Sequence, residues 1–237
     1  MASEVWGEEE ASEYDVTAAA MFDPSVLGPA VDYLVELASG GPVLEFAAGT
    51  GRVALEISAR GVAVSGIELS PHMARQMLAK PGADQVPIVV GDMTTTHVEG
   101  TFTLVYLVWN SIMNVTTQDG QAAVFENAAA HLGPGGHFVL EVEVPRPREH
   151  VFAMEDDHVG IDTVDDAVNQ IMTSHHWFEV DGTLRRRSGR FRYVWPSELD
   201  LMARLAGMKL VDRWAGWRRE AFTADSPSHV AVYQKID

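Results

Sequence analysis

Short apolar runs alternate with longer segments of helical periodicity over the first 144 residues. Short runs are typical of strands buried on both faces, whereas apolar residues at every third or fourth position are typical of helices. Helices are expected near 14–21 and over 24–38, 52–59, 71–78 and 118–132, and strands over 43–46, 62–67, 86–90, 102–108 and 137–144. This alternation predicts an α/β fold with a Rossmann-like, doubly wound, mostly parallel sheet.

The pattern changes after residue 145. Two strand-like runs, 170–180 and 183–195, flank Asp181-Gly182, and Asp-Gly between such runs predicts a β-hairpin. A helix over 196–206 and two last strands, near 208–214 and 229–234, would complete a seven-stranded sheet.

These elements predict a single domain over residues 1–237, without internal repeats or a low-complexity linker. Residues 1–40 are expected to form an N-terminal helical lid. Residues 145–195 are expected to form an inserted lid that carries the hairpin and binds substrate.

An acidic stretch precedes the hairpin. It consists of Glu155, Asp156, Asp157, Asp162, Asp165 and Asp166, with His158 among them. Such residues can ligate a metal ion, but a solvated loop explains the same composition. We expect a lid loop here and no metal.

The net charge of the chain indicates which class of substrate it can bind. Lys and Arg number 17 against 34 Asp and Glu, which gives a net charge of −17. Such a field repels phosphate backbones, so a small molecule is a better candidate substrate than a nucleic acid. No apolar run approaches the roughly 18 residues of a membrane span, and the acidic N-terminus does not resemble a secretory signal. We expect a cytoplasmic monomer or homodimer without a membrane partner.

The segment Glu45-Phe46-Ala47-Ala48-Gly49-Thr50-Gly51 carries the clearest chemistry. It follows a buried strand and precedes a helix, as in nucleotide-binding turns, where glycines let the main chain approach a ligand. A carboxylate at Glu45 would repel a pyrophosphate and attract an ammonium group. S-adenosylmethionine, with its amino-acid tail and sulfonium, fits that charge. The loose pattern G-x-G-x-x-A, from Gly49 to Ala54, leaves an NAD-dependent oxidoreductase as the rival hypothesis.

Over nearly its whole length the chain resembles the class I S-adenosylmethionine-dependent methyltransferases, and its layout is similar to bacterial enzymes that act on small metabolites such as amino sugars. The resemblance rests on four sequence motifs that occur in the family's order, namely Glu45–Gly51, Gly66-Ile67-Glu68-Leu69-Ser70, Gly91-Asp92-Met93 and Leu132–Phe138. It implies methyl transfer to nitrogen or oxygen by in-line displacement. It also implies that the last strand of the chain, near 229–234, is antiparallel and lies between the fifth and sixth strands, 137–144 and 208–214. A cofactor-binding regulator without turnover is a further alternative.

The resemblance also implies which residues bind the cofactor. Glu68 would accept from the two ribose hydroxyls and Asp92 from the adenine amine, although Asp92 could also be a plain turn residue. Tyr14 would close over the cofactor or pack on a surface helix. The full expected set is Tyr14, Glu45, Ala47, Gly49, Thr50, Gly51, Glu68, Leu69, Met73, Asp92, Met93 and Leu107.

The family shares no catalytic residue, so the acceptor side is inferred from position. Side chains that follow the strand over 102–108, lie at the end of the strand over 137–144 or belong to the lid should border the active cleft at the carboxyl ends of the strands. The expected set is Trp109, Asn110, Met113, Asn114, Glu143 and Tyr193. His175 and His176 are candidate general bases. Adjacent strand residues point to opposite faces, so at most one of the two can enter a given pocket.

Overall fold

Seven strands form the larger sheet in the computed structural model, which describes residues 6–148, 150–154, 158–180 and 183–236. They are β1 (Val43–Phe46), β2 (Val64–Glu68), β3 (Ile88–Val90), β4 (Phe102–Leu107), β5 (Leu132–Glu143), β10 (Met208–Trp214) and β11 (Ser228–Lys235). Their order is β10-β11-β5-β4-β1-β2-β3. β11 alone runs opposite to the other six strands, and it lies between β5 and β10 as expected. The predicted Rossmann-like sheet is confirmed.

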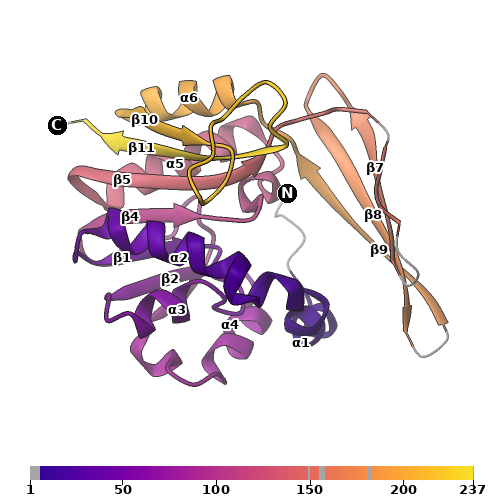
Figure 1. The fold of residues 1–237 in the computed structure, drawn as a ribbon, viewed down its shortest axis with the longest axis horizontal. Helices are drawn as coiled ribbons and strands as arrows, with labels where there is room; N and C mark the ends of the chain where they lie inside the picture. Colours follow the sequence, from indigo (N-terminus) through magenta and orange to yellow (C-terminus); the bar gives the residue numbers. More distant parts are fainter. Residues whose placement is uncertain (1–5, 149, 155–157, 181–182, 237) are drawn as a thin grey trace.

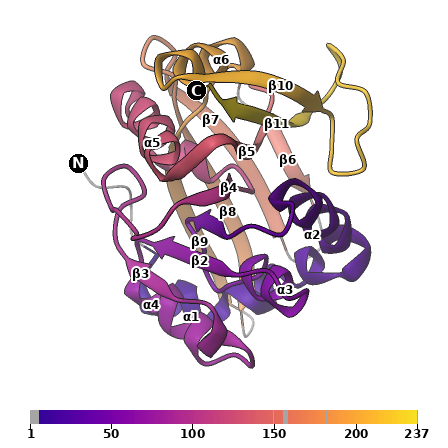
Figure 2. The ribbon, with the colours of Figure 1, turned by 90° about the vertical axis from the view of Figure 1, so that its left-hand side faces the viewer.

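Helices cover both faces of this sheet (Figure 2). They are α2 (Pro24–Ala38), α3 (Ala54–Ala59), α4 (Pro71–Leu78), α5 (Gln118–His131) and α6 (Pro196–Leu205), with short 3-10 turns η1 (Ala19–Phe22), η2 (Ala83–Gln85) and η3 (Ser111–Asn114). Strand β4 shows the two layers, because Val105 and Leu107 pack with α5 and α6 while Leu104 and Tyr106 pack with α2 and α3. All four are fully buried, as an apolar run without alternation predicts.

The entry into β5 differs from the sequence prediction. The strand begins at Leu132 rather than at His137. Leu132 pairs with Phe102 and His137 pairs with Leu104, so the glycine-rich turn over 133–136 is an irregularity in the ladder. The turn therefore interrupts pairing without ending the strand.

Four antiparallel strands form a second sheet, the lid sheet. They are β6 (His150–Met154), β7 (His158–Asp166), β8 (Ile171–Val180) and β9 (Thr183–Arg192). Strands β8 and β9 pair from Ile171↔Arg192 to Val180↔Thr183, which confirms the hairpin, although its turn at 181–182 lies outside the described residues. Figure 1 shows the lid sheet across the carboxyl ends of the parallel strands.

The prediction of a solvated loop over the acidic stretch is wrong for its described part. Residues 158–166 form β7, and Asp162 is 8% exposed. Val159, Ile161 and Thr163 alternate there with residues of the other face, a period-two pattern that the acidic composition obscured. Glu155, Asp156 and Asp157 lie outside the described residues.

The N-terminal segment divides into two parts. Helix α2 packs into the core of the larger sheet, where Val31 and Leu34 are buried. Helix α1 (Glu8–Thr17) instead lies between the larger sheet and the lid sheet (Figure 1). Its Glu13 pairs with Arg187 of β9 at 2.6 Å. Of the described part of the expected N-terminal lid, α1 therefore lies beside the lid sheet, whereas α2 belongs to the core of the larger sheet. Every helix in the described ranges falls short of what a membrane crossing requires.

Candidate active site

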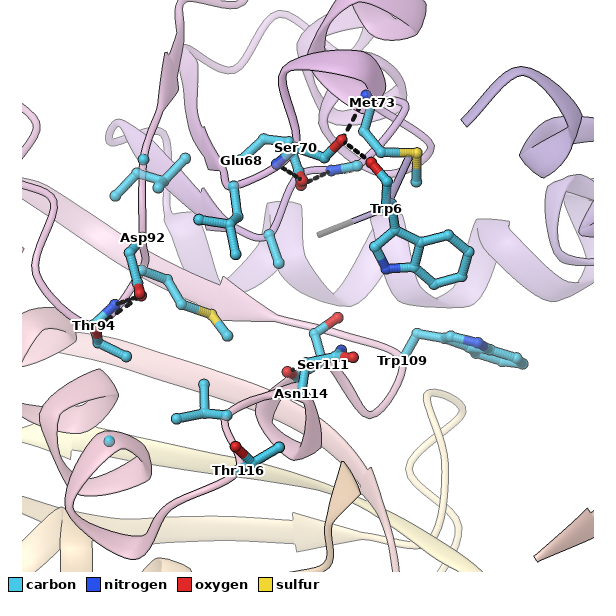
Figure 3. A pocket seen from close by; sticks show the side chains of 18 of the residues that line it. Trp6, Glu68, Ser70, Met73, Asp92, Thr94, Trp109, Ser111, Asn114 and Thr116 are labelled. Carbon is cyan, nitrogen blue, oxygen red and sulfur yellow. Dashed lines mark hydrogen bonds between the residues drawn. The ribbon is translucent and has the colours of Figure 1, made fainter. Parts of the chain in front are cut away.

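A cavity of about 270 Å³ opens at the carboxyl ends of β1, β2 and β4 (Figure 3). Its wall comes from the turns that follow these strands and β3, and from the N-terminal segment. The lining residues are Trp6, Tyr14, Ala47, Gly49, Ile67, Glu68, Leu69, Ser70, Met73, Gly91, Asp92, Met93, Thr94, Trp109, Ser111, Asn114, Val115, Thr116, Thr117 and Gly120. This is the edge at which ligands bind in open α/β sheets.

The turn after β1 has a left-handed backbone at Ala47, Gly49 and Gly51, with φ of 54°, 59° and 81°. A Cβ at Gly49 would have no neighbour closer than 3.8 Å, so its backbone conformation rather than crowding favours glycine. The open side of Gly49 lets a ligand approach the main chain.

Glu68 joins the turns after β1 and β2. Its carboxylate accepts hydrogen bonds from Gly49 N at 2.8 Å and from Ser70 N at 2.7 Å (Figure 3). Burial raises the pKa of Glu68, although the backbone hydrogen bonds oppose the rise. Each carboxylate oxygen can accept a further hydrogen bond, so a pair of hydroxyls in the cavity would find two acceptors.

Glu45 lies outside the cavity wall, 2% exposed. Burial raises its pKa to about 8, although the neighbouring Tyr106 hydroxyl and Arg52 guanidinium oppose the rise. Its Oε2 and the Tyr106 hydroxyl have no hydrogen bond of normal geometry to a described residue. The ionised form of Glu45 is therefore disfavoured at neutral pH, and of Glu45 and Glu68 only Glu68 borders the cavity.

Asp92 borders the cavity and also fixes its own turn. Its Oδ1 accepts hydrogen bonds from the Thr94 backbone at 2.8 Å and from the Thr94 hydroxyl at 2.7 Å. The amide of Asn127 donates to the carbonyls of Met93 and Thr96, which ties this turn to α5. Asp92 is therefore a turn residue that also borders the cavity, and its bond to the adenine amine stays a prediction.

Aromatic residues of the N-terminal segment close one side of the cavity. Trp6 and Tyr14 meet edge to face with ring centroids 5.4 Å apart, and the Trp6 carbonyl accepts from the Ser70 hydroxyl at 2.5 Å (Figure 3). Asp15 accepts a hydrogen bond from Thr50 at 2.6 Å, so the Thr50 side chain points to α1. Sequence reasoning missed Trp6, which precedes the expected helix in an acidic segment without a distinguishing pattern.

The chain leaves β4 through two left-handed residues, Trp109 and Asn110, with φ of 55° and 58°. This conformation is rare for a bulky side chain. Glu141 stabilises it by accepting from Trp109 N at 3.0 Å and from the Trp217 indole at 2.7 Å. Asn110 Oδ1 accepts from Glu143 N at 2.7 Å, so Asn110 braces the strand ends rather than lining the cavity.

The expected cofactor and substrate residues fall into two groups. On the cavity wall lie Tyr14, Ala47, Gly49, Glu68, Leu69, Met73, Asp92, Met93, Trp109 and Asn114. Away from it lie Glu45, Thr50, Gly51, Leu107, Asn110, Met113, Glu143 and Tyr193. Leu107, Met113 and Tyr193 belong to the buried core. Residues 111–120 were largely missed, although they follow the same strand end as Trp109.

The two candidate bases lie on opposite faces of β8. His176 contacts His158 and Ser174, on the face where the neighbouring Arg187 pairs with Glu13 of α1. His175 contacts Ser188 and Arg186 on the other face. Since α1 also carries Tyr14 of the cavity wall, the face with His176 is the one on the side of the cavity.

The cavity fits S-adenosylmethionine better than a dinucleotide. Glu68 and Asp92 offer acceptors, and Ile67, Leu69 and Met93 offer an apolar surface for a purine. No Lys, Arg or His is among the described residues of its wall, so a pyrophosphate would face carboxylates without a cation.

Comparisons with known proteins agree with this fit. A family model described as "Methyltransferase domain" matches residues 43–136. The chain is 26% identical to a cypemycin N-terminal methyltransferase from Streptomyces sp, over 94% of this chain and 98% of that protein. The solved structure of the CcbJ methyltransferase from Streptomyces caelestis shares 31% identity over 100% of both chains, with a TM-score of 0.88. The fold also matches SAM-bound CalS10, an amino pentose methyltransferase from Micromonospora echinaspora, at 22% identity over 93% of this chain and 96% of that one, with a TM-score of 0.70.

Proposed function

The chain belongs to the S-adenosylmethionine-dependent methyltransferases, and on that premise we propose that it methylates an amine nitrogen of a small molecule. S-adenosylmethionine is its cofactor. The observation that carries the proposal is the cavity at the strand tips, with Glu68 on its wall and an aromatic rim at Trp6, Tyr14 and Trp109. Small polar acceptors suit a chain with a net charge of −17, which disfavours a nucleic acid.

The donor site is formed by the tips of β1, β2 and β3. The Gly49 turn holds the methionine part, the Glu68 carboxylate accepts from the ribose hydroxyls, and Asp92 accepts from the adenine amine. The lone pairs that the backbone hydrogen bonds leave on Glu68 support this role. Glu45 supports the turn from beneath, since it is buried away from the cavity wall.

When bound, the cofactor supplies a methyl group that its sulfonium makes electrophilic. The protein then has to align the acceptor and exclude water. Trp109, Ser111 and Asn114 border the cavity where the acceptor would enter, and the lid sheet lies across this edge (Figure 1). Alignment of this kind can contribute about 7–11 kcal/mol to lowering the barrier.

The names of two relatives and the position of His176 on the lid sheet support an amine rather than a hydroxyl as the methyl acceptor. The cypemycin enzyme is named for an N-terminus, and CalS10 for an amino sugar. An amine needs only a mild base, and His176 lies on the face of the lid sheet where Arg187 pairs with Glu13 of α1. We propose the same class of acceptor here, with the enzyme acting as a monomer or homodimer.

A two-stage experiment tests this function. First, S-adenosylhomocysteine should raise the melting temperature of the purified protein, while NADH and NADPH should not. Second, S-adenosylmethionine should be turned over with members of a panel of amino sugars and short peptides with free N-termini, detected as methylated product by mass spectrometry. Matched sugars in which a hydroxyl replaces the amine are the control. Methylation of the hydroxyl panel alone would reject the amine, and stabilisation by NADH alone would reject the function.

A further inference from the structure

Three polar side chains form a hydrogen-bonded row on one face of the lid sheet. His158 Nε2 lies 3.0 Å from His176 Nδ1, and His176 Nε2 lies 3.2 Å from Ser174 Oγ. The two imidazole rings are nearly parallel, at 5°. Both nitrogens of His176 are therefore engaged, one by a second histidine and one by a hydroxyl.

The row has a consistent set of proton positions. If the Ser174 hydroxyl donates to His176 Nε2, then His176 Nδ1 carries the proton and donates to His158 Nε2. His158 then carries its remaining proton on Nδ1. The hydroxyl oxygen of Ser174 is left able to accept a proton from a donor in front of the sheet.

Several charged groups surround His176. His158 and Asp162 face it from β7, Arg187 faces it from β9, and His175 adjoins it on its own strand. Burial lowers the pKa of His176, the positive charges of His158, His175 and Arg187 lower it further, and Asp162 opposes them. The imidazole is therefore neutral and able to accept a proton at neutral pH.

The row lies on the face directed to the cofactor cavity. Arg187, the cross-strand partner of His176, pairs with Glu13 of α1 at 2.6 Å. The next residue of α1, Tyr14, lines the cavity. The Phe152 ring, with its centroid 5.3 Å from that of His176, packs over Gly160, where a Cβ would come within 2.3 Å of it. An apolar side chain thus partly shields the row.

We propose that Ser174, His176 and His158 form a proton relay that takes one proton from the acceptor nitrogen during methyl transfer, an inference that rests on the proposed function. The acceptor nitrogen forms the new N–C bond with its lone pair, while the C–S bond breaks and its electron pair stays on sulfur. The nitrogen then gives one N–H proton to Ser174 Oγ, and the Ser174 proton moves to His176 Nε2.

The remaining steps carry the charge away. The Nδ1 proton of His176 moves to His158 Nε2, and the Nδ1 proton of His158 passes to solvent. Each group gains one proton and loses one, so all three end neutral. His158 is a positioning residue, because it fixes the tautomer of His176 and acts through it.

Nuclear magnetic resonance titration of the histidine ring protons tests the row without any substrate. The His176 resonance should titrate below the usual histidine range, and H158Q should raise its pKa by removing a neighbouring positive charge. H175Q is the matched control, because His175 also lowers the pKa of His176 but lies on the other face, so its removal should raise that pKa by less. Equal effects of H158Q and H175Q on His176 would overturn the relay.

Kinetics with the amine identified in the panel test the catalytic role. H176Q and S174A should each lower kcat by about 10²-fold or more and H158Q by about 10-fold, whereas H175Q should stay within about 2-fold of wild type. The wild-type rate should fall as pH drops through the pKa of His176, and this acid limb should disappear in H176Q. An unchanged acid limb in H176Q would overturn the relay.

The two proposals fail in different ways. S-adenosylhomocysteine should bind H176Q, H158Q and wild type equally well in calorimetry. If wild type itself does not bind S-adenosylhomocysteine, the proposed function is rejected. Normal binding and wild-type turnover in both H176Q and H158Q would reject the relay alone.

Discussion

The edge of the larger sheet that borders the cavity, at the tips of β1 and β2, and the facing side of the lid sheet differ in how they are built. At that edge, backbone groups and a buried carboxylate, Glu68, determine the shape of the cavity. On the lid, side chains pair with side chains, as in the contact between His158 and His176. The difference suggests that the donor is recognised by backbone geometry, which a short motif can encode, whereas the acceptor is handled by side chains with no fixed spacing.

The attachment of the lid gives the largest expected effect. Arg192, at the end of β9, is 3% exposed, donates to Gln170 at 3.0 Å and pairs with Glu198 of α6 at 2.7 Å. R192A should lower the free energy of unfolding by about 3 kcal/mol, because it leaves the Glu198 carboxylate, whose side chain is only 13% exposed, without its cation. Urea denaturation measures this loss.

R190A is the control for that prediction. Arg190 lies on the same strand but is exposed. The change should cost no more than about 0.5 kcal/mol. Equal losses in both variants would mean that the lid is not anchored through Arg192.

Removal of the Glu68 carboxylate should affect only the edge of the larger sheet that borders the cavity. E68A should weaken S-adenosylhomocysteine binding by about 30- to 150-fold, the equivalent of about 2–3 kcal/mol, because the ribose hydroxyls lose a charged acceptor. Calorimetry measures the affinity, with E56A on the exposed side of α3 as the control. Unchanged affinity in E68A would remove Glu68 from the donor site.

Alanine substitutions at two glycines distinguish the cost of backbone strain from the cost of crowding. Gly51 and Gly82 have nearly the same φ, 81° and 82°, but only at Gly51 would a Cβ meet a neighbour, Met77 Cγ at 2.7 Å. G82A should cost about 1–2 kcal/mol of stability from strain, and G51A about 1–3 kcal/mol more from overpacking. Equal losses by urea denaturation would show that crowding beneath the turn is unimportant.

The contact between α1 and the lid should give the smallest effect. Glu13 and Arg187 are partly exposed, so E13Q should cost only about 0.2–1 kcal/mol. The loss should shrink in high salt, because salt screens exposed charges. Thermal unfolding at low and high salt measures it. A loss above about 2 kcal/mol, or one that salt leaves unchanged, would show a role beyond a surface ion pair.

The sequence predicted much of the cavity wall, including Gly49, Glu68 and Asp92, because its signals are local. The turn after β1 and the acidic tip of β2 each lie within a few residues of a buried strand, and ligand sites gather at such tips. The prediction for Glu45 depended on which way one carboxyl points, and this follows from packing against Tyr106 rather than from the motif.

The lid was harder to predict because composition and periodicity disagree there. Aspartates over 158–166 suggested a loop, yet alternate positions face the other side of a strand. The pairing of His158 with His176 depends on the register of β7 against β8, which places Gly160 opposite His176. No spacing rule in a single sequence determines that register.

The central claim is that the methyl donor lies at the tips of β1 and β2, with the lid supplying only the chemistry of the acceptor. A crystal structure of the protein with S-adenosylhomocysteine tests it most directly. We predict the ribose hydroxyls within hydrogen-bond distance of Glu68 and the amino-acid tail against the Gly49 turn. A ligand bound elsewhere, or held by the His158–His176 row, would contradict the account.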